Sequence, residues 1–226
     1  MGVLILKICI GLVCSVAFAG IISWLSVNYL DQKKAPILTV LKEHKKLTVI
    51  TAICYCAIAV FSLAMQHQHS HPFFSVIQYI ILWDVVLSVA WIDHKVKKIP
   101  NQFMLILLAV RAVGVIIDVI QSPDNVIPIL SGALLGMFVG GFIILICMLI
   151  SRGGIGAGDM KLFGVIGFYF GVAGIIQVMM YSLMLSAVFS IGMLIARKAK
   201  LKSTLAMAPF IFLGLSVFLI FLMMME

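Results

Sequence analysis

Charged residues in this chain are few and clustered, and the segments between the clusters are long enough to cross a lipid bilayer as helices. Only 11% of the 226 residues are charged, whereas a soluble domain carries about 25%. Hydrophobic residues make up 64% of the chain, and the mean hydropathy is +1.24. A helix needs roughly 20 apolar residues to cross the hydrocarbon core. The pattern predicts an all-α integral membrane protein.

The apolar runs recur from one end of the chain to the other. No polar stretch exceeds about 20 residues, which is too short to bury a core of its own, so a single polytopic domain over residues 1–226 is expected. The first run is expected to stay uncleaved, because Lys7 interrupts the basic-then-apolar order of a signal peptide. About eight spanning helices are predicted, at 3–28, 47–65, 73–92, 102–120, 127–150, 160–174, 176–196 and 205–225.

The polar connections between these spans alternate in charge. Fourteen of the sixteen Lys and Arg residues lie in four connections: 29–46, 93–101, 151–159 with the adjoining Lys161, and 197–204. The intervening connections at 66–72, 121–126 and near 171–175 hold none. Loops rich in Lys and Arg stay in the cytoplasm. We therefore expect both termini outside and all four basic loops on the cytoplasmic face.

Neither a nucleic-acid partner nor a metal or other cofactor is expected. The net charge of +8 is explained by membrane topology, and the basic loops lack interleaved aromatic residues. All five cysteines fall inside apolar runs, unlike those of disulfide frameworks or zinc sites. The alternating His67, His69 and His71 have no nearby carboxylate or cysteine, and we interpret them as polar linker.

Small residues mark one predicted helix contact. Gly132, Gly136 and Gly140 recur at every fourth position in the fifth predicted span. Small residues at this spacing let two helix backbones approach closely within lipid. The spacing therefore predicts tight packing of this span against another.

Two aspartates lie at the predicted cytoplasmic ends of spans. Asp93 follows the third span and precedes Pro100, which forces its preceding residue out of helical geometry and suits the first turn of a helix. Asp159 follows a stretch with three glycines in five positions, 154–158, which lets a peptide chain pass close by. Asp159 then opens the sixth span, where the helix dipole favours a negative charge.

Two carboxylates at the same membrane depth can act on one water molecule. When they share a proton, one serves as base toward the water and the other as acid toward a carbonyl. This is aspartic-protease chemistry, which needs neither a metal nor a nucleophilic serine or cysteine. From the residues alone, a helix cap at Asp159 and a solvated loop acid at Asp93 stay open as the alternative.

A second pair of charges lies deeper in the predicted spans. Asp84 precedes Asp93 by nine residues, and Arg111 follows Asn101 by ten. At 1.5 Å per residue, each is about 14 Å into the membrane. We expect the two to pair, because ionisable groups at that depth find partners. Asp118, near the external end of its span, is expected to be solvated.

Three motifs occur in order along the chain: Asp93 with Ile99-Pro100-Asn101, the run Gly156-Ala157-Gly158-Asp159-Met160-Lys161-Leu162, and Ala208-Pro209-Phe210. Together they resemble the type IV prepilin peptidases, which are similar to the wider group of GxGD membrane aspartic proteases. The motifs extend over about three fifths of the chain. The resemblance implies that Asp93 and Asp159 are the catalytic pair. The residues that bind substrate or shape the site are then Gly156, Gly158, Lys161, Pro100, Asn101 and Pro209. Two roles are open for Lys161: it either lowers the pKa of Asp159 or only follows the positive-inside rule.

The resemblance also implies a substrate and a location. The substrate is a prepilin or pseudopilin with a short basic leader, a glycine before the cut bond and an apolar helix after it. The cut falls at the cytoplasmic face of a prokaryotic inner membrane. Many bacterial members carry Cys-x-x-Cys pairs in a long first cytoplasmic loop and also methylate the new N-terminus. Loop 29–46 is short and has no cysteine, so methyltransferase activity is not expected.

Two other classes of protein compete with this interpretation. A small transporter or an assembly subunit would use charges near the bilayer midplane, where Asp84 and Arg111 are predicted but Asp93 and Asp159 are not. A presenilin-like protease shares the GxGD element, but its first aspartate is expected deep in a span beside a tyrosine. Asp93 instead follows Ile92 at the edge of its span.

Overall fold

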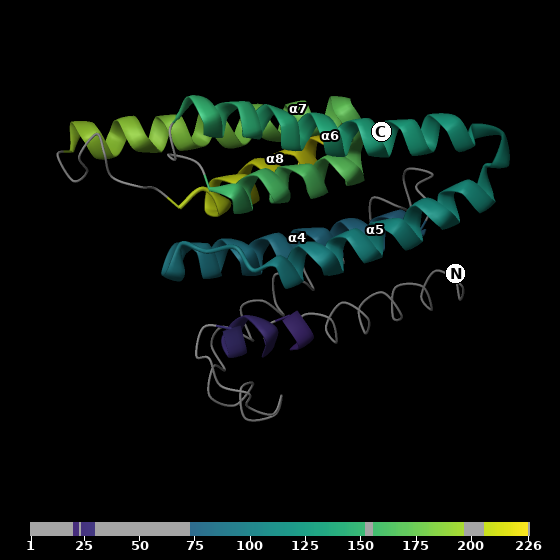
Figure 1. Cartoon of the computed structure of the whole chain (residues 1–226), viewed down its shortest axis with the longest axis horizontal. Helices are drawn as coiled ribbons and strands as arrows, with labels where there is room; N and C mark the ends of the chain where they lie inside the picture. Colours follow the sequence, from purple (N-terminus) through teal and green to yellow (C-terminus); the bar gives the residue numbers. More distant parts are fainter. Residues whose placement is uncertain (1–19, 23, 30–72, 152–155, 197–205, 226) are drawn as a thin grey trace. The chain divides into compact units, whose positions relative to one another are not determined.

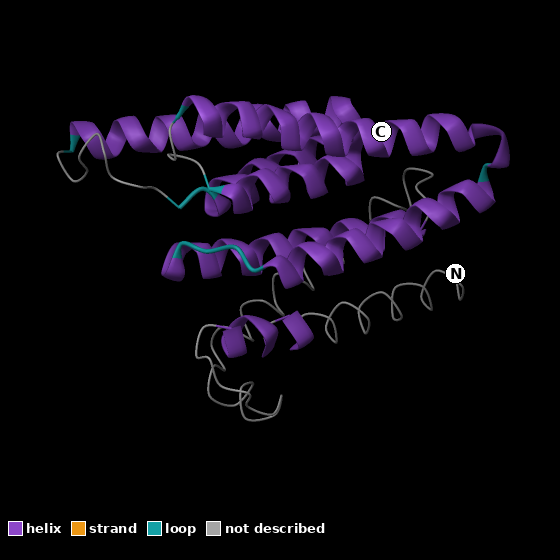
Figure 2. Ribbon diagram, in the orientation of Figure 1, coloured by secondary structure: helices purple, strands orange, loops and turns teal. Residues whose placement is uncertain are grey.

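The computed structural model describes residues 20–22, 24–29, 73–151, 156–196 and 206–225. Figure 2 shows that the regular elements in this part of the chain are all helices. After a helical stretch within 20–29, they are α4 (Phe73–Val96), α5 (Asn101–Gln121), the 3-10 helix η1 (Pro123–Asn125), α6 (Val126–Ile150), α7 (Ala157–Ile195) and α8 (Ala208–Met225), labelled in Figure 1. The predicted span 47–65 and most of 3–28 lie outside the described residues.

The described helices have the length and apolar character that the sequence predicts. Four can cross a membrane by these criteria: Ile77–Val96, Asn101–Gln121, Pro123–Ile150 and Ala157–Ile195. Ala208–Leu222 is a shorter apolar helix. Large apolar side chains such as Ile127 and Ile150 lie largely exposed on α6, as suits a lipid-facing surface. The total of eight spans and the outward placement of both termini stay predictions.

The helix α7 covers two predicted spans, 160–174 and 176–196, and a break at Gly171 divides it. Gly171 has φ 67° and ψ −168°, a conformation that L side chains rarely adopt. The break falls at the external turn predicted near 171–175. A straight helix of 39 residues would be about 58 Å long, roughly twice the thickness of the hydrocarbon core. The turn at Gly171 makes two shorter arms instead, and Figure 1 shows the second, lime-green arm running back past the first.

Glycines let α6 and the first arm of α7 come into backbone contact. A Cβ atom on Gly136 would collide with the carbonyl oxygen of Gly167, and one on Gly167 would collide with that of Gly136. A Cβ on Gly140 would lie 2.6 Å from the carbonyl oxygen of Phe163. The tight packing predicted from the glycine spacing is therefore confirmed at Gly136 and Gly140. Gly132 has open space at its Cβ position.

The chain divides into two compact units, and the division falls within α4. One unit comprises Met1–Ser88 with Met223–Glu226, and the other comprises Val89–Leu222. The prediction of a single domain over 1–226 stays a prediction. Asp93 and Asp159 both belong to the second unit. The residues that hold these two carboxylates belong to it as well.

The contact between α6 and α7 predicts opposite effects for two glycines on one helix. Gly136→Ala should lower the free energy of unfolding by about 1–3 kcal/mol, because the added methyl group overpacks against backbone atoms that cannot move aside. Gly132→Ala is the matched control, and it should leave stability unchanged or raise it by up to about 1 kcal/mol through helix propensity. Unfolding in mixed detergent–SDS micelles measures both. Equal stabilities of the two variants would contradict the close contact.

Candidate active site

Asp93 lies in the last turn of α4. The sequence placed it in the connection after the helix, and this placement is wrong because α4 continues to Val96. The Lys97 N–H closes the helix on the Asp93 carbonyl oxygen at 2.8 Å, with Lys97 in the left-handed region at φ 54°. Asp93 is only 6% exposed. Its Oδ2 accepts a hydrogen bond from the Ala208 N–H at 3.1 Å, and the Met207 backbone also bonds to it.

Asp159 is the third residue of α7 and is 8% exposed. Its Oδ2 accepts a hydrogen bond from the Gly156 N–H at 3.2 Å, and its own N–H donates to the Gly156 carbonyl oxygen at 3.1 Å. Gly156 has no side chain, so this is the half of a capping box that the acidic residue supplies. Asp159 therefore does stabilise the start of its helix, as the open alternative proposed. That role does not use its second oxygen.

The Oδ1 atom of Asp159 is buried, and it has no hydrogen-bond partner among the described residues. A buried carboxylate oxygen normally has one, because leaving it without a partner is costly. The negative charge of Asp93 acts on Asp159 across the site. The structure thus brings the two predicted carboxylates within electrostatic range, both buried and each held by a backbone N–H. Such a pair can share a proton and bind one water molecule.

The connection between α4 and α5 docks on the first turn of α7. A Cβ atom on Gly158 would lie 2.9 Å from Cβ of Ile99, so only glycine fits there without a shift. Lys161 Nζ donates a hydrogen bond to the Asn101 side-chain oxygen at 2.9 Å. Pro100, between these two contacts, is buried and precedes α5 in an extended conformation. The contacts join the connection that follows Asp93 to the turn that carries Asp159.

Exposed basic side chains lie at the end of α4 beside this site. Lys95 stacks on the ring of Trp91, with Nζ 4.8 Å from the ring centroid. His94, Lys97 and Lys98 are also exposed. The surface at this end of the helix is therefore positively charged, while the two carboxylates are buried.

Arg111 forms an ion pair with Asp118. Its Nη1 lies 3.1 Å from Asp118 Oδ2, and its Nε donates a hydrogen bond to the Phe168 carbonyl oxygen at 3.2 Å. The expectation that Asp118 is solvated is wrong, because its side chain is 24% exposed and ion-paired. The sequence does contain a signal for this ion pair, because a spacing of seven residues places both side chains on one face of a helix. Asp84 is buried but belongs to the other compact unit, so its pairing with Arg111 stays a prediction.

The hydrogen bond from Arg111 explains how the break in α7 is tolerated. In a continuous helix the Phe168 carbonyl oxygen would accept from the N–H four residues later, beyond Gly171. The non-helical conformation of Gly171 interrupts that bond, and the Arg111 side chain supplies a donor in its place. Tyr169 adds a second link, since its hydroxyl donates to the Leu107 carbonyl oxygen at 3.0 Å. These bonds fix α7 against α5.

The backbone of Ala208 is the site component that sequence reasoning missed. The segment Ala208-Pro209-Phe210 is the third motif, and the resemblance implies that Pro209 shapes the site. Pro209 is the second residue of α8 and has no N–H to donate. The donor is the residue before it, and no side-chain pattern could reveal a backbone contact between residues 115 positions apart. Among the described residues, no three His, Cys, Asp or Glu side chains gather as metal ligands.

Comparison with known proteins finds a matching family model and a similar protein. A family model described as the type IV leader peptidase family matches residues 79–191, half of the chain and both aspartates. The chain is 27% identical over 135 residues to a "Prepilin leader peptidase/N-methyltransferase" of Bacillus subtilis (strain 168). The match covers 60% of this chain and 52% of the relative, so the chain spans about half the length of that protein. No solved structure matches the chain.

The contact between Gly158 and Ile99 predicts a compensating pair of substitutions. Gly158→Ala should lower the free energy of unfolding by about 1–3 kcal/mol, because its methyl group would overlap the Ile99 side chain. Ile99→Ala in the same chain should restore most of the loss. Gly141→Ala, whose nearest atom would lie at 3.9 Å, is the control and should cause little change. Additive losses in the double variant would contradict the docking of the α4–α5 connection on α7.

Proposed function

Because this chain belongs to the type IV leader peptidase family, we propose that it is an aspartic endopeptidase whose catalytic residues are Asp93 and Asp159. One observation carries the proposal: two carboxylates from separate helices of one compact unit are both buried, and each is held by a backbone N–H. Burial excludes bulk water and strengthens the electrostatic effect of each carboxyl group on a bound reactant. Both aspartates lie within the matched region.

In the proposed mechanism, the two carboxyl groups divide the work of acid and base. The ionised carboxylate removes a proton from a water molecule as the water oxygen attacks the scissile carbonyl carbon. The protonated partner donates its proton to the carbonyl oxygen, which gives a neutral tetrahedral intermediate. Collapse of the intermediate breaks the C–N bond: the carboxyl group that took the proton returns it to the leaving amine, and the other carboxylate accepts a hydroxyl proton of the intermediate, which restores the starting pair. Asp159 Oδ1, buried without a described partner, is suited to bind the water.

The proposed substrate is a prepilin or pseudopilin. The name of the Bacillus subtilis relative includes prepilin leader peptidase activity, and the family model covers residues 79–191, which include both aspartates. We propose that the enzyme removes a short basic leader on the cytoplasmic side of a prokaryotic cell membrane. The basic residues at the end of α4 support this orientation through the positive-inside rule.

The proposal covers peptidase activity alone. The name of the relative also includes an N-methyltransferase, but the match spans only 52% of that protein. The predicted connection 29–46 contains no cysteine, so the Cys-x-x-Cys pairs of the longer members of the family have no counterpart in it. A non-enzymatic transporter or assembly subunit is the competing function. It gives no reason for a carboxylate to be buried at the end of α4 and another at the start of α7.

Cleavage of a co-expressed prepilin-like substrate tests the proposal. At matched membrane levels, Asp93→Asn and Asp159→Asn should each lower the cleavage rate by at least about a thousandfold. The double variant should be no slower than either single variant, because the two residues act as one unit. Asp124→Asn is the matched control, since Asp124 is exposed in η1, and it should cleave normally. Normal cleavage by either single variant would exclude that aspartate and favour the transporter or assembly function.

The role of Lys161 can be separated into charge and hydrogen bonding. If Lys161 works by holding Asn101, Lys161→Met should slow cleavage by about three- to tenfold, the effect of one lost hydrogen bond. Lys161→Gln keeps an N–H donor without the charge and should lose less activity. Lys98→Met removes an exposed lysine from the neighbouring connection and serves as the control. If the Gln variant were as slow as the Met variant, the charge of Lys161 would be the functional property.

A further inference from the structure

The first N–H of α8 has a partner far away in the chain. Ala208 is the first residue of α8, because the Met207 carbonyl oxygen accepts the first helical hydrogen bond from Ile211 at 3.1 Å. The first N–H groups of a helix have no partner within the helix itself. The Ala208 N–H instead donates to Oδ2 of Asp93 at 3.1 Å, in a buried contact. The start of α8 therefore holds one carboxylate of the pair.

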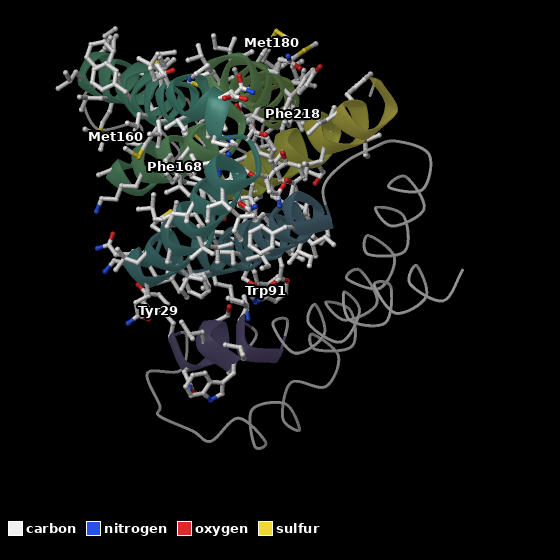
Figure 3. The ribbon with its side chains drawn as sticks, turned by 90° about the vertical axis from the view of Figure 1, so that its right-hand side faces the viewer. Tyr29, Trp91, Met160, Phe168, Met180 and Phe218 are labelled. Carbon is white, nitrogen blue, oxygen red and sulfur yellow. The ribbon has the colours of Figure 1, made fainter. Side chains whose placement is uncertain are left out.

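The body of α8 packs along the second arm of α7, beyond the break at Gly171, and the first arm of the same helix begins with the other carboxylate. The rings of Phe210 and Phe189 lie 5.3 Å apart, and those of Phe218 and Phe170 meet edge to face at 4.9 Å. Phe218 is labelled in Figure 3. Between these contacts, a Cβ atom on Gly214 would collide with the Ser182 side chain and crowd its backbone. The two helices thus approach as closely as backbones allow.

We propose that α8 is the positioning element of the carboxylate pair and that the Ala208 N–H is the group through which it acts. Asp93 comes from α4 and Asp159 from α7, and α8 contacts both: it binds the Asp93 carboxylate and packs along α7. Its position then sets the distance between the two carboxylates. This inference rests on the proposed peptidase function, and it adds a backbone group and a helix to the site.

The distance between the carboxylates matters because both must reach one water molecule. Proton transfer requires heavy atoms within about 2.6–3.2 Å of one another. A displacement of about 1 Å can slow a reaction about a hundredfold. A shift of α8 along α7 moves the Ala208 N–H and so moves Asp93 relative to Asp159. Substrate binding distant from the carboxylates would be unaffected, so the expected loss is in kcat and not in KM.

Ala208→Pro tests the proposal directly, because proline lacks the N–H that bonds to Asp93. Proline is well tolerated at the first position of a helix, where the missing N–H has no partner within the helix. An ordinary helix would therefore not be harmed by this substitution. We expect kcat for cleavage to fall about ten- to hundredfold with KM unchanged, at a normal unfolding temperature in detergent. Normal kcat in a folded Ala208→Pro variant would overturn the proposal.

A second pair of variants keeps the test independent of the proline. Gly214→Ala should displace α8 from α7 and lower kcat with KM unchanged, because its methyl group overlaps Ser182. Gly192→Ala is the matched control, since a Cβ atom there meets nothing within 4 Å. We expect normal kcat for Gly192→Ala. If Ala208→Pro does not fold, equal kcat values for the two alanine variants would overturn the proposal.

The same assay separates failure of this inference from failure of the proposed function. Asp93→Asn and Asp159→Asn are measured beside the α8 variants. If both abolish cleavage while Ala208→Pro and Gly214→Ala leave kcat normal, the peptidase stands and the role of α8 is overturned. If either Asn variant cleaves normally, the proposed function fails, and the role of α8 fails with it. A rise in KM without a fall in kcat would indicate substrate binding by α8 and would also overturn the positioning role.

Discussion

The hydrogen bond between the Ala208 N–H and Asp93 is the contact on which the arrangement of the site depends. A buried carboxylate is costly unless donors replace the water it has lost. Helix ends provide such donors, because their first N–H groups have no partner within the helix. Asp93 uses the start of α8, and Asp159 uses the N–H of Gly156 just before α7. Both carboxylates are thus held by backbone atoms, which ties their positions to the packing of whole helices.

That packing relies on residues without side chains. Gly136 and Gly167 bring α6 and α7 into backbone contact. The absence of a side chain at Gly158 leaves room for Ile99, and its absence at Gly214 leaves room for Ser182. Each contact leaves no room for a methyl group, so the helices have one close-packed position instead of a range of similar ones. Gly171 has a different role, since its positive φ reverses the chain within α7. Arg111 then bonds to the Phe168 carbonyl oxygen that the reversal leaves without its helical partner.

Much of the described fold follows from the order of apolar runs, and the positions of Asp93 and Asp159 at the ends of predicted spans make them candidates from the sequence alone. Apolar length and charge clusters predicted the helices from residue 73 onward to within a few residues, apart from the joining of two spans in α7. Local signals were less reliable at helix ends. Asp93 lies inside α4 because Lys97 adopts a left-handed conformation that nothing in its residue type predicts. Asp118 was expected in solvent, yet the long side chain of Arg111 reaches it along one face of α5.

The sequence by itself determined the helical, membrane-type composition, the positions of the apolar runs from residue 73 onward and the candidate pair Asp93 and Asp159. These properties depend on residue type and on spacing along the chain, and both can be read from the hydropathy pattern and the turn-forming residues. Only the tertiary structure decided that both aspartates are buried in one compact unit, that α8 donates to Asp93 and that Lys161 bonds to Asn101. These contacts join residues 60 or more positions apart, and one of them uses a backbone N–H that every residue except proline possesses. A pattern of side chains therefore cannot predict the contact from Ala208 to Asp93. The packing of the helices decides which backbone N–H bonds to that carboxylate.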